Sequence, residues 1–333
     1  MKILLLGGTV FLGRHIVNLA LERGHDLTLF NRGQSNPELY PEVETLKGDR
    51  DDGLTSLRGR SWDAVIDTSG YVPRVVRESA RWAADACDHY TFISTISVYD
   101  DLSRAGIDED APVGKLEDET VEEVDNHTYG PLKALCEDAV LDTFPGDAMI
   151  VRPGLIVGRY DPTDRFTYWP RRVARGGEVL MPGSLDRKIQ FIDVRDLAGW
   201  TLKMVEAGRS GTYNATGPEE PLTMIELLEA CRSAAERDVH FTSVSEAFLL
   251  EQGVTPWMEL PLWMPTPGPM DGLMEVSCRR ALDAGLTCRP LADTIEDTLS
   301  WVQEEQPGPP YKAGMDPKRE LELLRTWSEA ATR

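Results

Sequence analysis

Tyr129 and Lys133 are the residues whose types and spacing most directly suggest chemistry. They stand four residues apart in HTYGPLKALCE, residues 127–137, and on a helix this spacing places both side chains on one face. Pro131 is compatible with a first helical turn, where its missing N–H costs no hydrogen bond. A phenol has an ordinary pKa of about 10, and a nearby lysine cation favours the phenolate. We therefore predict a general acid/base whose pKa the lysine lowers.

A group of hydroxyl side chains precedes this pair at the end of an apolar run. The stretch FISTISVYD, residues 92–100, supplies Ser94, Thr95 and Ser97. Ligands of open α/β sheets bind at the carboxyl ends of strands, so a hydroxyl here can hydrogen-bond a substrate carbonyl beside the tyrosine. The alternative is that these hydroxyls only cap the strand end. We predict Thr95, Tyr129 and Lys133 as the catalytic residues.

A glycine-rich turn follows the first apolar run. Residues 6–13 read LGGTVFLG and lead into a helical pattern. Glycines let a backbone approach a dinucleotide pyrophosphate closely, and a helix N-terminus supplies free N–H groups. Gly7 and Gly13 hold the first and last positions of a G-x-x-G-x-x-G spacing, and Val10 holds the middle one. We expect a dinucleotide to bind here, more loosely or slightly displaced because of Val10; the alternative is a purely structural turn.

The second apolar run ends in FNRG, residues 30–33. NAD-binding folds place an acidic residue about 20 residues after the glycines, where it binds the ribose 2′-OH. Asn31 does not repel a 2′-phosphate, and Arg32 can pair with one. We therefore expect NADP to be favoured over NAD. Alternatively, Arg32 is a solvated surface residue and either cofactor is accepted.

The elements that must position these residues alternate along the chain. Apolar runs at 3–6, 27–30, 64–67, 90–94 and 149–152 predict strands, and the helix predicted at 14–23 ends before Gly24. A helical stretch is also predicted before each of the last three runs. This order predicts an α/β protein with a Rossmann-type doubly wound parallel sheet and a smaller C-terminal substrate-binding domain.

Domain boundaries follow from where this alternation weakens. The dinucleotide-binding domain is predicted at residues 1–153 plus about 190–215, and the substrate-binding portion at 154–189 and 216–305. Residues 306–333 are predicted to be a peripheral tail ending in a helix at 318–331. Residues 159–190 are rich in proline, glycine and arginine, and residues 254–272 carry several prolines with tryptophans and methionines, which predicts loops and short helices rather than sheet.

Composition restricts the class of protein. A net charge of −21 argues against nucleic acid, whose binding needs clustered lysine and arginine. No apolar run reaches the roughly 20 residues of a membrane helix, and no signal peptide is expected. The five cysteines, which form no CxxC pair, predict free thiols and a reducing compartment. We expect a cytoplasmic protein that binds a small-molecule substrate, no metal and possibly a second copy; its acidity would suit a salt-adapted host.

These motifs resemble the short-chain dehydrogenase/reductase superfamily, in its extended or atypical branch of NAD-dependent epimerases/dehydratases. The resemblance extends over most of the chain, through GGTVFLG, LKGDRDD (46–52), VIDTSGY (65–71), STISVY (94–99), YGPLK (129–133), VRPGLIVG (151–158), QFIDVRDLA (190–198) and GTYNATG (211–217). It implies that Tyr129 is the general acid/base, that Lys133 holds the nicotinamide ribose and that Thr95 orients the substrate. It also implies that Asp49 contacts adenine.

The predicted site residues follow from the motifs and this resemblance together. The cofactor-binding set is Gly7, Thr9, Val10, Phe11, Leu12, Gly13, Asn31, Arg32, Asp49, Arg50, Thr68, Ser69, Gly70, Tyr129, Lys133 and Pro153. The substrate contacts are Thr95, Ser97, Tyr99 and Arg187. No metal ligand is predicted.

Departures from the family pattern restrict the substrate. Leu155 stands where nucleotide-sugar epimerases carry an asparagine for the substrate diphosphate, and Ile189 where they carry an arginine, although Arg187 and Lys188 lie close. Ile96 and Ser97 replace the Asp-Glu pair of sugar-nucleotide dehydratases. These differences argue against a nucleotide-sugar substrate and against dehydration.

Two further groups of residues leave alternatives open. One is the set of arginines in the predicted loop region, which either bind an anionic substrate group or the cofactor phosphate, or pair with surface carboxylates: Arg159, Arg165, Arg171, Arg172, Arg175 and Arg187. The other either walls a pocket, fills a core or forms a dimer surface: Trp257, Met258, Trp263, Met264, Met270 and Met274.

The sequence therefore predicts an NAD(P)-dependent oxidoreductase that transfers hydride at a carbonyl or alcohol carbon of a small polar substrate. An NAD(P)-dependent sugar or nucleotide-sugar epimerase, which oxidises its substrate transiently, would use the same residues and stays open. A non-catalytic, NADP-sensing or RNA-binding member is the alternative of another class. The complete Thr95, Tyr129 and Lys133 set favours catalysis.

Overall fold

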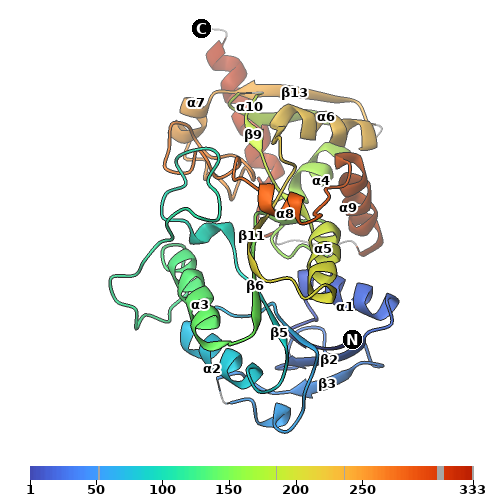
Figure 1. Ribbon diagram of the computed structural model, residues 1–333. Coiled ribbons are helices and arrows are strands. Elements are labelled where there is room, and N and C mark those ends of the chain that lie inside the picture. The colour runs from blue at the N-terminus through green and yellow to red at the C-terminus, as the bar shows by residue number, and fades with distance from the viewer. Residues whose placement is uncertain (52, 185, 236, 306–310, 332–333) are drawn as a thin grey trace.

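A seven-stranded, wholly parallel sheet forms the centre of the molecule (Figure 1). The computed structural model describes residues 1–51, 53–184, 186–235, 237–305 and 311–331. Strand order is β11-β6-β5-β4-β1-β2-β3, so the chain winds outward from β1 in both directions and confirms the predicted Rossmann-type fold. The strands are β1 (Lys2–Leu6), β2 (Asp26–Asn31), β3 (Glu44–Lys47), β4 (Ala64–Asp67), β5 (His89–Ile93), β6 (Asp147–Pro153) and β11 (Gly211–Ala215).

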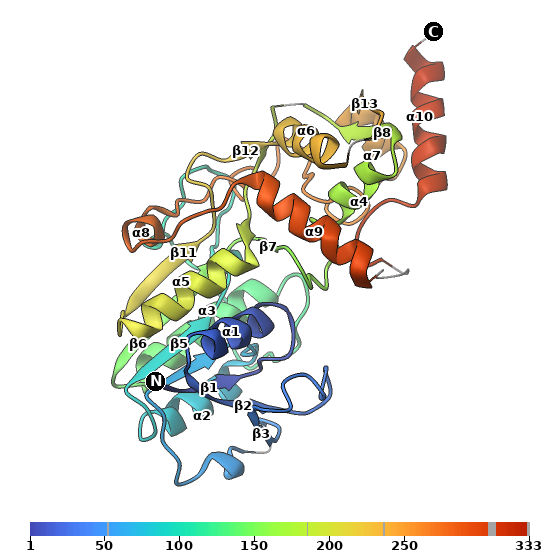
Figure 2. The same cartoon turned by 90° about the vertical axis from the view of Figure 1, so that its right-hand side faces the viewer.

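Helices cover both faces of this sheet. Alternate side chains of β1 point to opposite faces, so Ile3 and Leu5 pack with α1 and α5, whereas Leu4 and Leu6 pack with α2 and α3. Figure 2 shows α1 and α5 side by side on one face. The helices of this lobe are α1 (Phe11–Glu22), α2 (Pro73–Ala83), α3 (Tyr129–Thr143) and α5 (Val194–Glu206), with 3-10 turns η1 (Thr55–Leu57) and η2 (Ile96–Val98).

A smaller lobe packs beyond the carboxyl ends of these strands (Figures 1 and 2). Its core contains the fully buried Trp169 and Trp263. Its strands are β8 (Gly177–Pro182) paired with β13 (Val239–Val244), β9 (Lys188–Ile189) with β12 (Leu222–Thr223), and, at the junction, β7 (Ile156–Val157) with β10 (Ile192–Asp193). Its helices are α4 (Tyr168–Ala174), α6 (Met224–Ala235), α7 (Glu246–Glu251), α9 (Leu291–Glu305) and α10 (Pro317–Ala331). The short helix α8 (Arg279–Asp283) packs instead on β11 of the central sheet.

Two expectations about elements are wrong. Strand β3 was not predicted, and in the described part of 32–63 it and η1, rather than an α-helix, precede β4. Residues 159–190 are not free of sheet, because residues 177–182 form β8. The helix predicted at 318–331 is present as α10, and its Leu323 and Leu324 are buried in the core of the smaller lobe. Residues 306–310 and 332–333 of the tail lie outside the described residues, and the domain boundaries themselves stay a prediction.

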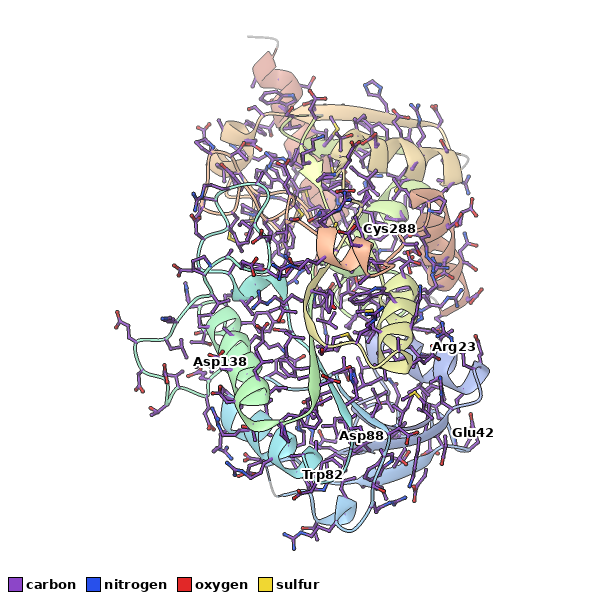
Figure 3. The ribbon with its side chains drawn as sticks, in the orientation of Figure 1. Arg23, Glu42, Trp82, Asp88, Asp138 and Cys288 are labelled. Carbon is purple, nitrogen blue, oxygen red and sulfur yellow. The ribbon has the colours of Figure 1, made fainter. Side chains whose placement is uncertain are left out.

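The cysteines are free thiols. Cys136, Cys231 and Cys278 are buried, whereas Cys87 and Cys288 are partly exposed; Figure 3 labels Cys288 beside α8. Among the described residues, no helix has the length and apolar character needed to cross a membrane. In the same residues, no three His, Cys, Asp or Glu side chains gather closely enough to hold a metal ion.

Candidate active site

A cleft of about 770 Å³ lies at the carboxyl ends of the central strands. Its walls come from the glycine turn after β1, the segments after β2, β3, β4 and β5, the start of α3 and the segment after β6. The fold therefore brings together most of the predicted site residues. Those that line the cleft are Gly7, Thr9, Val10, Phe11, Leu12, Gly13, Asn31, Arg32, Asp49, Arg50, Thr68, Ser69, Thr95, Tyr129, Lys133 and Pro153.

The glycine turn packs tightly against its own helix. Gly7 has φ +114°, and a Cβ on it would collide with the hydroxyl of Thr68. A Cβ on Gly13 would lie 2.9 Å from the Cα and N atoms of Gly8. The first turn of α1 therefore lies close to the strand end, with its N-terminus at the cleft. This cradle fits a dinucleotide pyrophosphate, which needs close backbone approach and free N–H groups.

Val10 is accommodated at the N-cap of α1. Its backbone is extended, with φ −129° and ψ 140°, which any residue can adopt. Its side chain is 47% exposed. The left-handed conformations fall instead on Gly7 and Gly8, and on Phe11 with φ +33°. The missing middle glycine therefore does not prevent this turn from forming.

The end of β2 supports the turn and lines the adenosine end expected for a dinucleotide. Asn31 donates from Nδ2 to the carbonyl of Gly7 at 3.2 Å and accepts from the N–H of Gly33 at 2.9 Å. The Asn31 side chain thus connects the backbones of two residues that line the cleft, Gly7 and Gly33. Arg32 is exposed on that wall, beside Gly33, Gln34 and Ser35, which sequence reasoning missed.

Arg50 is buried and already bonded. Its two terminal nitrogens donate to the two carboxylate oxygens of Asp67 at 2.8 and 2.7 Å, and its Nε donates to the Ser79 hydroxyl at 3.1 Å. Tyr90 also donates to Asp67, at 2.9 Å. Arg50 therefore fixes the segment after β3 against the end of β4, beside its neighbour Asp49.

The start of α3 brings Tyr129 to the hydroxyls after β5. Helix α3 begins at Tyr129, and a Cβ on the next residue, Gly130, would collide with the carbonyl oxygen of Ser97. Glycine therefore lets the first turn of α3 press against η2. Tyr129 and Thr95 line the same cleft, and the Thr95 hydroxyl is near enough to Tyr129 to lower its pKa. Thr95 Oγ1 also accepts from the N–H of Ser97 at 3.1 Å, which fixes its position.

Lys133 is buried behind this pair. Its Nζ donates to the carbonyl oxygens of Gly70 at 2.8 Å and Ile93 at 2.7 Å. An ammonium has three donors, so one remains for a ligand in the cleft. Burial lowers the pKa of Lys133 to about 8. On the same helix Asp138, which Figure 3 labels, is exposed.

The electrostatics of Tyr129 differ from the sequence expectation. Burial raises the pKa of Tyr129, and this outweighs the Thr95 hydroxyl and the positive charge of Arg165, which lower it. The tyrosine is therefore protonated at neutral pH in this structure. Ser94, also on the cleft wall, has a buried hydroxyl without a hydrogen-bond partner among the described residues. The cleft thus offers a proton donor and a further free hydroxyl to a polar ligand.

Residues 3–216 match the sequence profile of the NAD dependent epimerase/dehydratase family. The chain belongs to this family. Family membership confirms the resemblance found in the motifs and the NAD(P)-binding character of the fold.

Two curated proteins are similar to this chain over about 70% of its length. Bovine "epimerase family protein SDR39U1" is 26% identical over 254 residues, which are 71% of this chain and 81% of that protein. "Chloroplast stem-loop binding protein of 41 kDa b" from Arabidopsis thaliana is 26% identical over 253 residues, which are 70% of this chain and 63% of that protein.

Solved structures share the epimerase/dehydratase fold at lower identity. UDP-glucuronic acid 4-epimerase from Bacillus cereus, in complex with NAD, aligns with TM-score 0.65 and 14% identity over 92% of this chain and 99% of that one. Human epimerase family protein SDR39U1 (isoform 2), with NADPH, aligns with TM-score 0.61 and 20% identity over 90% and 99%. Structural relatives thus hold either cofactor.

Four predicted residues of this epimerase/dehydratase chain are not among the described residues that line the cleft: Gly70, Ser97, Tyr99 and Arg187. Gly70 and Ser97 act through the bonds to Lys133 and Thr95 given above. Tyr99 donates to Asn214 at 2.6 Å and accepts from Arg152 at 3.1 Å in a buried network. Arg187 is bonded to Glu246 and to the carbonyl of Met264. Tyr71, which sequence reasoning missed, lines the cleft with its ring 6.4 Å from that of Tyr129.

Proposed function

We propose that this protein is an NAD(P)-dependent oxidoreductase that acts at a carbonyl or alcohol carbon of a small polar substrate. The observation that carries this proposal is the pair Thr95 and Tyr129, in one cleft with the glycine turn and the buried ammonium of Lys133. A bound nicotinamide dinucleotide would supply the hydride donor or acceptor. It would be held by the turn after β1, the N-terminus of α1, the segment around Asp49 and the free donor of Lys133.

The chain's own groups would handle the oxygen and its proton. Thr95 donates a hydrogen bond to the substrate oxygen, which orients the carbon beside it. In reduction, Tyr129 donates the hydroxyl proton to the developing alkoxide; in oxidation, it takes that proton back. Because burial raises the pKa of Tyr129, the protonated form is available for reduction at neutral pH. Lys133 holds the backbone after β4 and β5 in place through its two carbonyl contacts.

Replacement of Tyr129 tests this function. We expect Tyr129→Phe to lower kcat by about 10²–10⁴-fold, because the proton has no other donor of this geometry, while dinucleotide affinity stays within about threefold. A panel of small carbonyl and alcohol compounds, followed by cofactor absorbance, identifies a substrate, and calorimetry measures binding. Tyr213→Phe, on β11 with its hydroxyl bonded to Ser210, is the matched control. Unchanged turnover in Tyr129→Phe would refute the assignment.

We also propose that NADP is preferred over NAD. Neither Arg32 nor Lys47 has an ion pair among the described residues. The Lys47 side chain runs along Gly33, and its Cε would lie 3.1 Å from a Cβ atom placed on that glycine. Two exposed cations without a partner carboxylate, in a chain of net charge −21, favour a 2′-phosphate at this end of the cleft.

Cofactor affinities test this preference. Arg32→Ala is expected to weaken NADPH binding by about tenfold or more and Lys47→Ala by less, because a guanidinium binds phosphate bidentately, while NADH binding changes by less than about threefold. Arg81→Ala, at an exposed position of α2, is the control. Tighter binding of NADH than of NADPH by the wild-type protein would overturn the proposal.

Epimerisation is the second candidate, and the family and the names of its relatives support it. The same residues would remove and return one hydride. The positions of Leu155 and Ile189 and the bonding of Arg187 to Glu246 speak against a nucleotide-sugar substrate. Product formed with equal consumption of NADPH supports the oxidoreductase, whereas an inverted stereocentre formed with catalytic cofactor supports the epimerase.

Nucleic acid is a poor candidate partner for so acidic a chain, and a homodimer stays a prediction.

A further inference from the structure

One aromatic side chain of the cleft, Tyr71, lies beside the catalytic groups and keeps half of its surface free. It follows β4 directly, lines the cleft and is 48% exposed. The centroid of its ring lies 6.4 Å from that of Tyr129, with 37° between the ring planes, and 5.4 Å from Nζ of Lys133. The free half of this ring is therefore open to a ligand next to both groups that the proposed chemistry uses.

The segment that carries Tyr71 is packed tightly against the sheet. A Cβ on Gly70 would lie 2.6 Å from Cε2 of Phe92 and 2.7 Å from Cγ2 of Val76, so this close approach requires glycine. The Gly70 carbonyl also accepts from Nζ of Lys133 at 2.8 Å. These contacts fix the backbone from which the Tyr71 ring extends into the cleft.

The strand order separates the charged part of the cleft from its reacting end, which comprises Tyr71, Tyr129 and the lining residues from the ends of β5 and β6 onward. In the order β6-β5-β4-β1-β2-β3, the segments after β2 and β3 lie on the far side of β1. They carry the charged lining residues Arg32, Asp49, Arg50 and Asp51. The rest of the reacting end is lined by hydroxyl-bearing, small or apolar residues: Ile93, Ser94, Thr95, Pro153, Gly154, Ile156 and Pro162.

Among the described residues that line the reacting end, no cation is left for a charged substrate. Lys133 donates to the carbonyls of Gly70 and Ile93, and the proposed function gives its third donor to the dinucleotide. The six arginines between residues 159 and 187 are not among the described lining residues. Four of them pair with carboxylates: Arg159, Arg171, Arg172 and Arg187. An uncharged substrate is therefore favoured, because an anion would lose hydration there without gaining a partner.

A free ring beside the acid/base pair contacts the part of a substrate next to its reacting carbon. Aromatic rings prefer offset or edge-to-face neighbours with centroids about 4.5–7 Å apart. Tyr71 and Tyr129 are spaced within this range, so a substrate whose oxygen contacts Tyr129 brings its adjacent atoms within reach of Tyr71. Covering the free half of the ring with a flat apolar group would stabilise the complex through hydrophobic burial and the ring contact together.

We propose that Tyr71 is a specificity-determining residue that selects an uncharged substrate whose carbonyl or alcohol carbon is attached to an aromatic ring. The substrate ring packs against Tyr71 while its oxygen contacts Thr95 and Tyr129. This assignment rests on the proposed function for the identity of the reacting carbon. It narrows the substrate class to small aromatic aldehydes, ketones and alcohols.

Binding of three small alcohols tests this aromatic wall, formed by Tyr71, without knowledge of the natural substrate. The full-length protein is saturated with NADPH, with which an alcohol cannot react, and ligand-observed NMR measures binding. We expect benzyl alcohol to bind about fivefold or more tighter than 1-propanol, which lacks a ring, and than 4-(hydroxymethyl)benzoate, which adds a charge. In Tyr71→Ala the affinity for benzyl alcohol is expected to fall about fivefold or more, whereas that for 1-propanol changes by less than about twofold.

Two further variants separate the ring of Tyr71 from general effects. Tyr71→Phe keeps the ring and is expected to retain the affinity for benzyl alcohol within about twofold. Tyr311→Ala removes an exposed ring of the smaller lobe that is not among the described lining residues, and it is expected to change all three affinities by less than about twofold. NADPH affinity, measured by calorimetry, is expected to stay within about threefold of the wild type in each variant, which also shows that the variant is folded.

Three results would overturn the aromatic wall. One is the absence of saturable benzyl alcohol binding by the wild type, or equal affinity in the wild type and Tyr71→Ala. Another is tighter binding of 4-(hydroxymethyl)benzoate than of benzyl alcohol. The third is a loss of NADPH affinity in Tyr71→Ala with unchanged affinity for benzyl alcohol, which would mean that the ring covers the cofactor instead.

Failure of the aromatic wall and failure of the proposed function give different results. If Tyr129→Phe abolishes turnover of the identified substrate while Tyr71→Ala leaves its KM unchanged, the wall is wrong and the function stands. If benzyl alcohol binding depends on Tyr71 while Tyr129→Phe turns over normally, the function is wrong and the wall stands. A rise in KM in Tyr71→Ala with little change in kcat supports both.

Discussion

The hydroxyl, carboxyl and ammonium groups around the cleft show how burial changes the chemistry of single residues. Tyr129 and Asp161 are held toward their neutral forms by burial, and Lys133 also loses a proton more easily than an exposed lysine. Groups perturbed in this way gather where a protein does chemistry more often than elsewhere. Tyr129 and Lys133 line one cleft, which supports placing catalysis there.

Asp161 gives a stability prediction at the residue scale. Burial raises its pKa from 3.8 to about 6. Because the folded protein binds this proton more tightly than the unfolded chain, Asp161 costs nothing below pH 3.8, and the cost grows as the pH rises to about 6. Above pH 6 it amounts to about 3 kcal/mol. Asp161→Asn, which keeps the acceptor for Thr163, should therefore gain stability over the wild type as the pH rises.

Urea unfolding at pH 4 and pH 8 measures this effect. The difference in unfolding free energy, variant minus wild type, should be larger at pH 8 by about 2–3 kcal/mol. Asp138→Asn, at an exposed position of α3, should show a change of less than about 0.5 kcal/mol between the two pH values. The same difference at both pH values would contradict a buried, proton-binding Asp161.

At the scale of elements, the packing of β1, the glycine turn and α1 explains why position 13 of the motif needs glycine and position 10 does not. Gly13 lies where the helix meets the turn, so a side chain there would press on the backbone of Gly8. Val10 lies in extended conformation at the helix start, with its side chain partly in solvent. The helix and the turn approach each other at Gly13 and not at Val10.

This contrast predicts opposite outcomes for two small substitutions. Gly13→Ala should lower the unfolding free energy by about 1–3 kcal/mol and weaken NADPH binding by tenfold or more, because the turn must shift. Val10→Gly should stay within about 1 kcal/mol of the wild type and within about threefold in NADPH affinity, because glycine is an adequate N-cap residue. Chemical unfolding and calorimetry measure both. A large gain of affinity in Val10→Gly would mean that Val10 obstructs the dinucleotide.

The sequence predicted the strands that are buried along their whole length. It did not predict the exposed edge strand or the strand whose partner is distant in the sequence. Strands such as β1 and β4 are buried on both faces and appear as unbroken apolar runs. Edge strand β3, Glu44–Lys47, is largely exposed and carries no such pattern. Strand β8 begins at a glycine and ends at a proline, and it is stabilised by β13, far along the chain, so nothing local distinguishes it from a loop.

Site prediction had the same limit. Thr95, Tyr129, Lys133 and the glycine turn lie in local motifs next to strand ends, and the topology brings them to one cleft. Arg187 looked equally available in sequence, yet its charge is taken by Glu246, a partner that only the fold reveals.

At the scale of the whole molecule, buried polar groups link α3 to the sheet and to the segments above it. Arg152 on β6 donates to Glu137 on α3 and to Tyr99, which also contacts Asn214 on β11. Glu109, from the long segment before α3, accepts from the Asn214 N–H at 2.8 Å. These buried polar contacts hold α3 against the sheet. Because α3 carries Tyr129 and Lys133, they also fix where these two side chains stand relative to the strand ends that line the cleft.

Net charge gives the prediction for the molecule as a whole. The net charge is −21 at neutral pH and the pI is near 4.7, so negative charges on the folded protein repel one another. Salt screens this repulsion. We expect the Tm at pH 7.5 to rise by about 5 °C or more between 0.01 and 0.5 M KCl, where the Debye length falls from about 30 Å to a few Å, and to change little above that. At pH 4.7, where the net charge is near zero, the same salt series should leave the Tm almost unchanged. Calorimetric scans at both pH values separate charge screening from a general effect of salt on hydrophobic burial, because only the screening effect disappears at the pI. An equal rise of the Tm at both pH values would assign the stabilisation to hydrophobic burial.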